Sequence, residues 1–166
     1  QLTNIKEADP EVLVMTDFYS TVGLIAKQAR ALGIDATFLG GDGWDSTDLV
    51  NIGGEAMEGA YYSVFYSSDD TSEAVTAFKE AYGAAFGGAV PDGYAALSYD
   101  AAMILMDAID RADSTDGAAI KDALMTTNLD CVSGNVTYDE NRNPIKPATI
   151  CTIKDGKATY YSTVQP

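Results

Sequence analysis

Apolar positions in the first quarter of the chain follow two alternating patterns. An unbroken apolar run at 12–15 is typical of a strand buried on both faces. From 20 to 33, apolar residues recur three and four positions apart, which predicts an amphipathic helix that ends at Gly33. A second short strand is predicted at 37–40. Because strand, helix and strand follow one another, we expect a parallel βαβ unit with a right-handed crossover.

Helical and strand patterns also alternate over the rest of the chain. Residues 59–66 are aromatic and β-branched and predict a strand, and the polar stretch 67–71 is interpreted as a crossing into a second lobe. Asp155-Gly156 is the pair preferred in two-residue hairpin turns, so the last two strands should form a hairpin. The other predicted elements are helices at 72–86, 94–109 and 117–126 and strands at 135–138, 148–153 and 158–161.

Composition excludes several classes of function. The 166 residues include 25 acidic and 10 basic side chains, a net charge of −15, so nucleic acid is excluded as a partner and anionic membrane surfaces are disfavoured. The chain has no His, which excludes imidazole bases, Ser-His-Asp triads and His metal sites. No run approaches the roughly 20 apolar residues that a membrane span needs, so we expect no direct membrane insertion of this segment.

The two cysteines, Cys131 and Cys151, leave two alternatives open. They form one disulfide, or they are two buried thiols. The predicted reversal of the chain between them favours the disulfide. Two thiols are too few for a four-ligand zinc site.

Five blocks of sequence carry a resemblance to one protein family. They are Asp17–Gly33, Phe38–Asp45, Gly54–Gly59, Tyr94–Ala102 and Gly134–Asn141. In these blocks the chain resembles the periplasmic substrate-binding proteins of branched-chain amino acid ABC transporters, the Leu/Ile/Val-binding type. The resemblance covers essentially the whole chain but only the C-terminal half of such a protein.

This resemblance implies the fold class, which is α/β, periplasmic binding protein type I. Such a protein has two lobes with doubly wound parallel sheets, joined by a hinge. By resemblance, 1–64 form part of the C-terminal lobe, 65–147 form part of the N-terminal lobe, and 148–166 return to the C-terminal lobe. The fragment would then lack the first two strands of the C-terminal lobe and the opening sheet of the other. We therefore expect unpaired strand edges and exposed apolar helix faces.

The chain begins at Gln1 without an initiator Met, which is typical of a cut end. The resemblance implies a precursor with a signal peptide. It also implies a periplasmic or extracellular location, with a lipid anchor outside the cell membrane in a Gram-positive organism. The implied partners are an amino acid ligand, an ABC transporter permease and the remainder of the same protein.

Asp42 is the most informative candidate for a binding residue. It directly follows a predicted strand, where an open parallel sheet presents its ligand crevice. In the family, an acidic residue at this place accepts hydrogen bonds from the ligand ammonium. The competing interpretation is an ordinary turn residue. Its neighbours Gly41 and Gly43 are predicted to give the backbone the freedom to aim Asp42 into the crevice.

Four aromatic residues are further candidates, three by resemblance and Trp44 because it adjoins Asp42. Phe18 and Tyr19 follow the first strand at the matching crevice edge, where the family has two tyrosines, or they pack beneath the following helix. Tyr94 matches an aromatic position that contacts the ligand side chain, or it is a core residue of its helix. Trp44 either forms a wall of the pocket or covers the end of the sheet.

The leading hypothesis is a solute receptor of an ABC importer, which binds a small aliphatic amino acid between two lobes by hinge closure and is neither an enzyme nor dependent on a cofactor. One alternative is a sensor of the same fold for an amide or urea. A second alternative is a metal-dependent enzyme that uses Asp42 and Asp45 with Asp48 nearby. The spacing of these acids does not match a Ca²⁺ loop, and Asp45 is predicted to cap a short helix instead. Tyr99-Asp100 is interpreted as a packing and hydrogen-bonding pair.

Overall fold

The computed structural model describes residues 1–165, which fall into two compact units. Unit 1 contains Gln1–Val64 and Thr149–Thr163, and unit 2 contains Phe65–Ala148 together with residues 164–165. The assignment of these units to the C-terminal and N-terminal lobes of the family stays a prediction. Residue 166, the last of the stretch predicted to return to the C-terminal lobe, lies outside the described residues.

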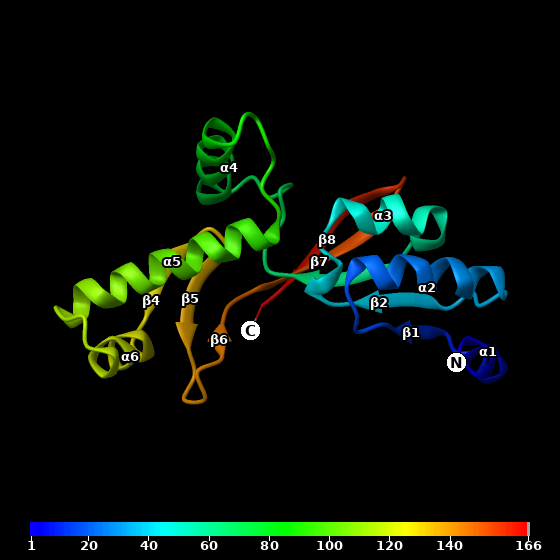
Figure 1. Ribbon diagram of the computed structural model, residues 1–166, viewed down its shortest axis with the longest axis horizontal. Coiled ribbons are helices and arrows are strands. Elements are labelled where there is room, and N and C mark those ends of the chain that lie inside the picture. Colours follow the sequence, from blue (N-terminus) through cyan, green and yellow to red (C-terminus); the bar gives the residue numbers. More distant parts are fainter. Residues whose placement is uncertain (166) are drawn as a thin grey trace. The chain divides into compact units, whose positions relative to one another are not determined.

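Unit 1 is built on a five-stranded sheet in the order β1-β2-β3-β7-β8 (Figure 1). The first three strands are parallel to one another, and β3 pairs with β7 in the antiparallel sense. The strands and the parallel βαβ unit predicted from the apolar runs are therefore confirmed. The strands are β1 (Val12–Val14), β2 (Thr37–Gly40), β3 (Tyr61–Val64), β7 (Ala148–Lys154) and β8 (Lys157–Val164).

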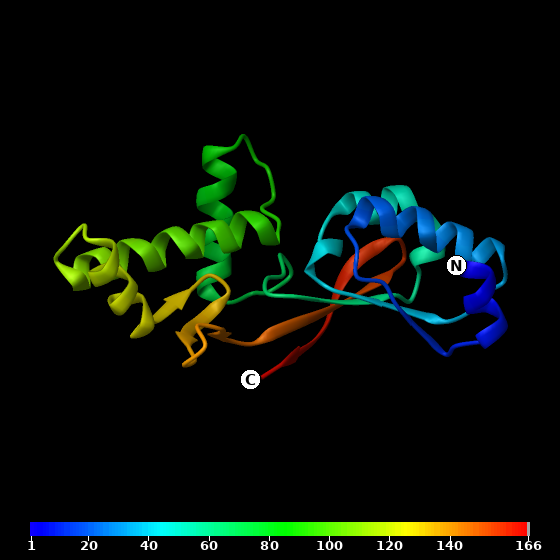
Figure 2. The ribbon, with the colours of Figure 1, turned by 60° about the horizontal axis from the view of Figure 1, so that its bottom comes forward.

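Two helices cover one face of this sheet side by side, as Figures 1 and 2 show. They are α2 (Tyr19–Ala31) and α3 (Thr47–Gly53). They approach closely at Gly23, where an added Cβ would lie 2.8 Å from Ile52 Cγ2 and 3.0 Å from the Gly53 nitrogen. Small residues at this contact therefore set the distance between the helices. The remaining elements of unit 1 are α1 (Leu2–Ala8), the 3-10 turn η1 (Asp42–Trp44) and the 3-10 turn η2 (Gly54–Met57).

Arg30 joins the end of α2 to the start of β2. Its Nη1 donates to the carbonyl oxygens of Ile34 at 2.6 Å and Ala36 at 2.9 Å. The guanidinium carbon lies 3.9 Å from the centre of the Phe38 ring, which is fully buried. These contacts order the short connection between helix and strand and so help fix where β2 begins.

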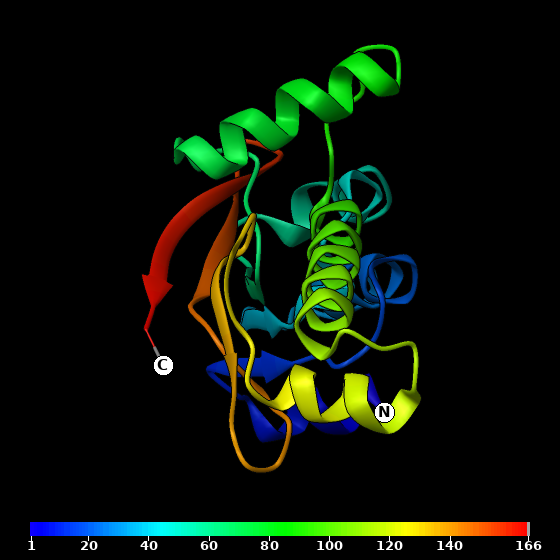
Figure 3. The same ribbon diagram turned by 90° about the vertical axis from the view of Figure 1, so that its left-hand side faces the viewer.

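Unit 2 holds three helices and a small antiparallel sheet, β4-β5-β6. The long helix α5 contacts both α6 and β4, and Figure 3 shows it along its axis. Ser72, Asp92 and Asp116 cap the three helices by accepting backbone N–H groups. The elements are α4 (Glu73–Ala85), α5 (Gly93–Ala112), α6 (Gly117–Met125), β4 (Asn128–Cys131), β5 (Gly134–Tyr138) and β6 (Pro144–Ile145).

Neither cysteine takes part in a disulfide, so the disulfide favoured from the sequence is wrong. Cys131 packs with Ile104 and Val136 in a cluster of unit 2, whereas Cys151 belongs to the main core of unit 1. The prediction treated the two strands as one reversing pair, but β4 pairs with β5 and β7 pairs with β3. The second alternative, two buried thiols, is therefore what the structure contains.

The predicted hairpin turn at Asp155-Gly156 is confirmed, because both residues have positive φ, 51° and 69°, as a type I′ turn requires. The carboxylate of Glu58 accepts the backbone N–H of Asp155 at 2.8 Å and of Gly156 at 3.3 Å. The turn is thus tied to the segment before β3.

We expect Gly156→Ala to lower the free energy of unfolding by about 1 kcal/mol, because alanine is strained at positive φ. Urea denaturation measures the change. Gly117→Ala is the matched control, because Gly117 begins α6 in ordinary helical space and an added Cβ meets nothing within 4 Å in the described chain. Equal stabilities of the two variants would contradict the assignment of the turn.

Candidate functional site

The carboxyl ends of β1 and β2 bring two of the predicted residues to neighbouring loops. The segment after β1 carries Phe18, and the segment after β2 carries Asp42. The two segments touch at Gly43, where an added Cβ would lie 3.4 Å from the Asp17 carbonyl oxygen and from Phe18 Cδ1. Parallel strands place their carboxyl ends at one edge, which is where open α/β sheets bind ligands.

Asp42 is solvent-exposed and is the first residue of η1. Its backbone carbonyl accepts the N–H of Asp45 at 3.0 Å, which holds the turn closed. The carboxylate therefore stands on a short, ordered turn at the sheet edge. Its contact with a ligand ammonium stays a prediction.

The two aromatic residues after β1 have different environments. Phe18 is 60% exposed, whereas Tyr19 is half-buried and packs against the main core of unit 1. The carboxylate of Asp17 accepts the Phe18 N–H at 2.7 Å and so orders the turn into α2. Of the two, Phe18 presents its ring to solvent, and the packing interpretation fits Tyr19. Asp17 was not among the predicted site residues, although a polar residue shortly after an apolar strand is a recognisable signal.

Trp44 is fully buried, so it covers the end of the sheet and presents no surface to a ligand in this structure. Its ring lies against Gly40, where an added Cβ would be only 2.0 Å from Trp44 Cε2, and its centre is 6.1 Å from that of Tyr62. Burial raises the pKa of Tyr62 far above its ordinary value, with further increases from Cys151 and Asp45. Trp44 is thus a core residue, and its buried indole anchors η1, the turn to which it belongs.

The glycines and acids around Asp42 differ from expectation in two ways. Gly41 has a φ of −111°, which any residue adopts, and an added Cβ there meets nothing within 4 Å in the described chain. The prediction that the backbone needs a glycine at position 41 to aim Asp42 is therefore wrong. The lack of a side chain at Gly41 does leave open space beside Asp42. Asp45 does not cap α3. Ser46 does, with its Oγ accepting the Asp48 N–H at 3.1 Å, whereas Asp45 lies at the end of η1.

The acidic residues of this edge do not form a metal site. Among residues 1–165, no group of three or more His, Cys, Asp or Glu side chains is arranged to hold a metal ion. The geometry thus gives no support to the alternative of a metal-dependent enzyme built on Asp42 and Asp45.

Tyr94 lies in unit 2, at the second position of α5, and is 44% exposed. Further along the same helix, the interpretation of Tyr99-Asp100 as a packing and hydrogen-bonding pair is confirmed. The Tyr99 ring centre lies 5.1 Å from that of Phe78. Asp100 is buried and accepts the backbone N–H groups of residues 132 and 133 at 2.8 and 3.0 Å.

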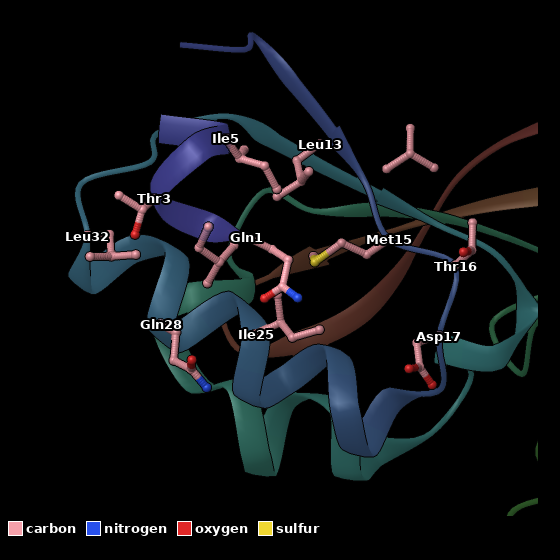
Figure 4. A pocket seen from close by; sticks show the side chains of 12 residues that line it. Gln1, Thr3, Ile5, Leu13, Met15, Thr16, Asp17, Ile25, Gln28 and Leu32 are labelled. Carbon is pink, nitrogen blue, oxygen red and sulfur yellow. The ribbon is translucent and has the colours of Figure 1, made fainter. Parts of the chain in front are cut away.

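A separate pocket of about 610 Å³ opens among α1, β1 and α2, as Figure 4 shows. Apolar side chains from all three elements line it, including Ile5, Leu13 and Ile25, and Asp42 is not among its lining residues. The outer edge of β1 pairs with no strand within residues 1–165, and Val14 on it is 61% exposed. The structure therefore has the unpaired strand edge expected of a partial sheet.

Residues 1–158 match the family described as periplasmic binding protein. The chain belongs to this family. Within it, a Leu/Ile/Val-binding protein homolog from Brucella suis is 29% identical over 96% of this chain and 43% of the relative. A leucine-, isoleucine-, valine-, threonine- and alanine-binding protein from Pseudomonas aeruginosa is 25% identical over 84% of this chain and 37% of the relative.

Solved structures confirm the predicted α/β, periplasmic binding protein type I fold for this family member. A leucine binding protein, LivK, from Thermotoga maritima has a TM-score of 0.90 at 34% identity and matches all of this chain but 48% of that one. LivJ from Streptococcus pneumoniae, a branched-chain amino acid transporter substrate binding protein solved with isoleucine, has a TM-score of 0.83 at 30% identity, over 99% of this chain and 47% of that one. The chain thus spans less than half the length of each of these four relatives.

The relatives' names describe binding proteins and not enzymes. Among residues 1–165, no helix is both long and apolar enough to cross a membrane.

Proposed function

We propose that this chain is part of an extracytoplasmic solute-binding protein of an ABC importer, and that it binds a small aliphatic amino acid without transforming it. The observation that carries the proposal is the exposed carboxylate of Asp42 on η1, a turn in contact with the loop of exposed Phe18. A carboxylate forms strong, charge-assisted hydrogen bonds with an ammonium group. An aromatic ring offers apolar surface to an aliphatic side chain. The relatives named for leucine, isoleucine and valine support this ligand class.

In this proposal, Asp42 accepts the ligand ammonium and Phe18 contacts the side chain. The open space at Gly41 leaves room for the ligand, and Tyr19 and Trp44 support the two loops from the core. Tyr94 contacts the ligand side chain from unit 2, and closure of the two units is a population shift stabilised by contacts to both. The protein acts in the periplasm or outside the cell membrane, where a lipid anchor holds it in a Gram-positive cell. It delivers the ligand to an ABC transporter permease.

Nuclear magnetic resonance titration of the ¹⁵N-labelled chain with L-leucine tests the proposal. We expect chemical-shift changes at the amides of Phe18, Asp42 and Gly43, with a dissociation constant on the order of millimolar or weaker, because the chain covers under half of its relatives. Asp42→Asn should abolish these changes. Asp35→Asn is the matched control, an exposed acid before β2 at the opposite end of that strand.

The ligand series separates the alternatives. 4-Methylpentanoate keeps the carbon skeleton of leucine but lacks the ammonium, so it should cause no shifts at Asp42. Equal shifts with this acid, or leucine shifts that persist in Asp42→Asn, would refute the role of the carboxylate. Shifts with acetamide or urea but not with leucine would favour the amide or urea sensor instead.

A further inference from the structure

Two of the places where the chain passes between units lie opposite each other at the end of one strand pair. The chain leaves unit 1 after Val64 and re-enters it at Thr149. These two residues are register partners in the β3–β7 ladder, and theirs is the last pair on this side of it. The chain also crosses after Thr163. At the two crossings next to Val64 and Thr149, the residues just inside unit 2 are therefore placed to control how these two segments move together.

Lys146 lies in the segment that returns to unit 1 at Thr149. It contacts both the segment that leaves unit 1 after Val64 and the body of unit 2. Its Nζ lies 4.7 Å from the centre of the Phe65 ring, the first residue of unit 2 after β3. The same Nζ donates to Ser133 Oγ at 2.9 Å, in the turn between β4 and β5. One half-buried ammonium thus joins the two crossing segments to the hairpin of unit 2.

The hairpin turn that carries Ser133 is itself held in place. The buried Asp100 carboxylate of α5 accepts the N–H of Val132 at 2.8 Å and of Ser133 at 3.0 Å. Burial lowers the pKa of Lys146, and the Asp100 carboxylate acts in the opposite direction. The ammonium is therefore partly desolvated, and its protein contacts take the place of water. Because of this, loss of either contact costs more free energy than it would at an exposed lysine.

We propose that Lys146 clasps these two crossing segments to unit 2, so that they move with this unit and bending within them is confined to the backbone φ and ψ angles on either side of the 64–65 and 148–149 peptide bonds. Two segments that were each loose over several residues would give many relative orientations. Segments held at Phe65 and Lys146, close to the boundary, leave a short pivot with few rotatable backbone dihedrals. The proposal concerns the connection and not the ligand, so it stands or falls independently of the proposed function.

Limited digestion with chymotrypsin, with cut sites located by mass spectrometry, tests the clasp. In Lys146→Met, which keeps the unbranched stem of the side chain but loses the charge and the hydrogen bond, we expect cleavage after Phe65 and Tyr66 to accelerate about tenfold. Cleavage after Phe86, which is exposed in the loop after α4 of the same unit, should keep its rate. Lys157→Met is the matched control at an exposed lysine of β8 and should change neither rate.

Ser133→Ala provides a second variant that removes only the hydrogen bond acceptor. It should accelerate cleavage at Phe65 and Tyr66 by a smaller factor than Lys146→Met. If Lys146→Met left these sites unchanged, the clasp would be refuted. If it accelerated cleavage after Phe86 to the same extent, Lys146 would be a general stabiliser of unit 2, and the proposal would also fail.

Discussion

Gly40→Ala is expected to destabilise unit 1 by about 3 kcal/mol, because the new methyl group would occupy the space of the Trp44 ring. An added Cβ would lie 2.0, 2.3 and 2.5 Å from three ring atoms of Trp44, far inside van der Waals contact. The ring is fully buried and packs near Tyr62, so it cannot move without disturbing the core. Displacement of the indole would also disturb η1, which carries Asp42.

Urea denaturation followed by tryptophan fluorescence measures this effect, since Trp44 is the single Trp of the chain and reports on unit 1. The emission of Gly40→Ala should also shift to longer wavelength as the indole meets water. Gly41→Ala is the neighbouring control and should change the free energy of unfolding by less than about 0.5 kcal/mol. Gly53→Ala should also be more destabilising than Gly41→Ala, because an added Cβ would lie 2.4 Å from Cγ of the fully buried Met57 side chain and 3.3 Å from Gly23 Cα. A Gly40→Ala protein as stable as Gly41→Ala would contradict the packing described above.

Regular elements with strong local patterns could be predicted from the sequence. The strand at 37–40 has the predicted bounds, and the helix predicted at 117–126 ends one residue earlier in the structure. Such elements are recognisable because their apolar spacing matches a single regular geometry. Short polar strands could not be found in this way. β4 has the sequence Asn-Leu-Asp-Cys, and its strand conformation depends on pairing with β5, which local spacing does not reveal.

The candidate site shows the same limit. The position of Asp42 and Phe18 at one sheet edge follows from the order of strand and helix, so it could be predicted. The burial of Trp44 could not, because it depends on the absence of a side chain at Gly40 and on the Tyr62 ring of another strand. The contacts of Lys146 were also missed, since Phe65 and Ser133 are far from it in sequence.

Asp100→Ala is expected to lower the free energy of unfolding by about 3–5 kcal/mol and to act on unit 2. The buried carboxylate accepts two backbone N–H groups of the β4–β5 turn, and alanine would leave both without this acceptor. Circular dichroism at the helical band during urea denaturation follows the loss, because unit 2 contains the long helix α5. Asp110→Ala is the matched control, an exposed acid on the same helix, and should change stability by less than about 0.5 kcal/mol.

The thiol of Cys131 gives a second measurement that separates the charge of Asp100 from its hydrogen bonds. Burial and then the Asp100 carboxylate raise the pKa of this thiol to about 11, so at neutral pH it is protonated and unreactive. Asp100→Asn keeps an oxygen acceptor but removes the charge, so it should destabilise less than Asp100→Ala while still lowering the pKa of Cys131. Thiolate absorbance as a function of pH, with Cys131→Ala to identify the signal, measures this shift. If the titration of Cys131 in Asp100→Asn matched that of the parent chain, the carboxylate would not act on the thiol. If Asp100→Ala were as stable as Asp110→Ala, its two hydrogen bonds would not hold the hairpin, and the turn that carries Ser133 would need another support.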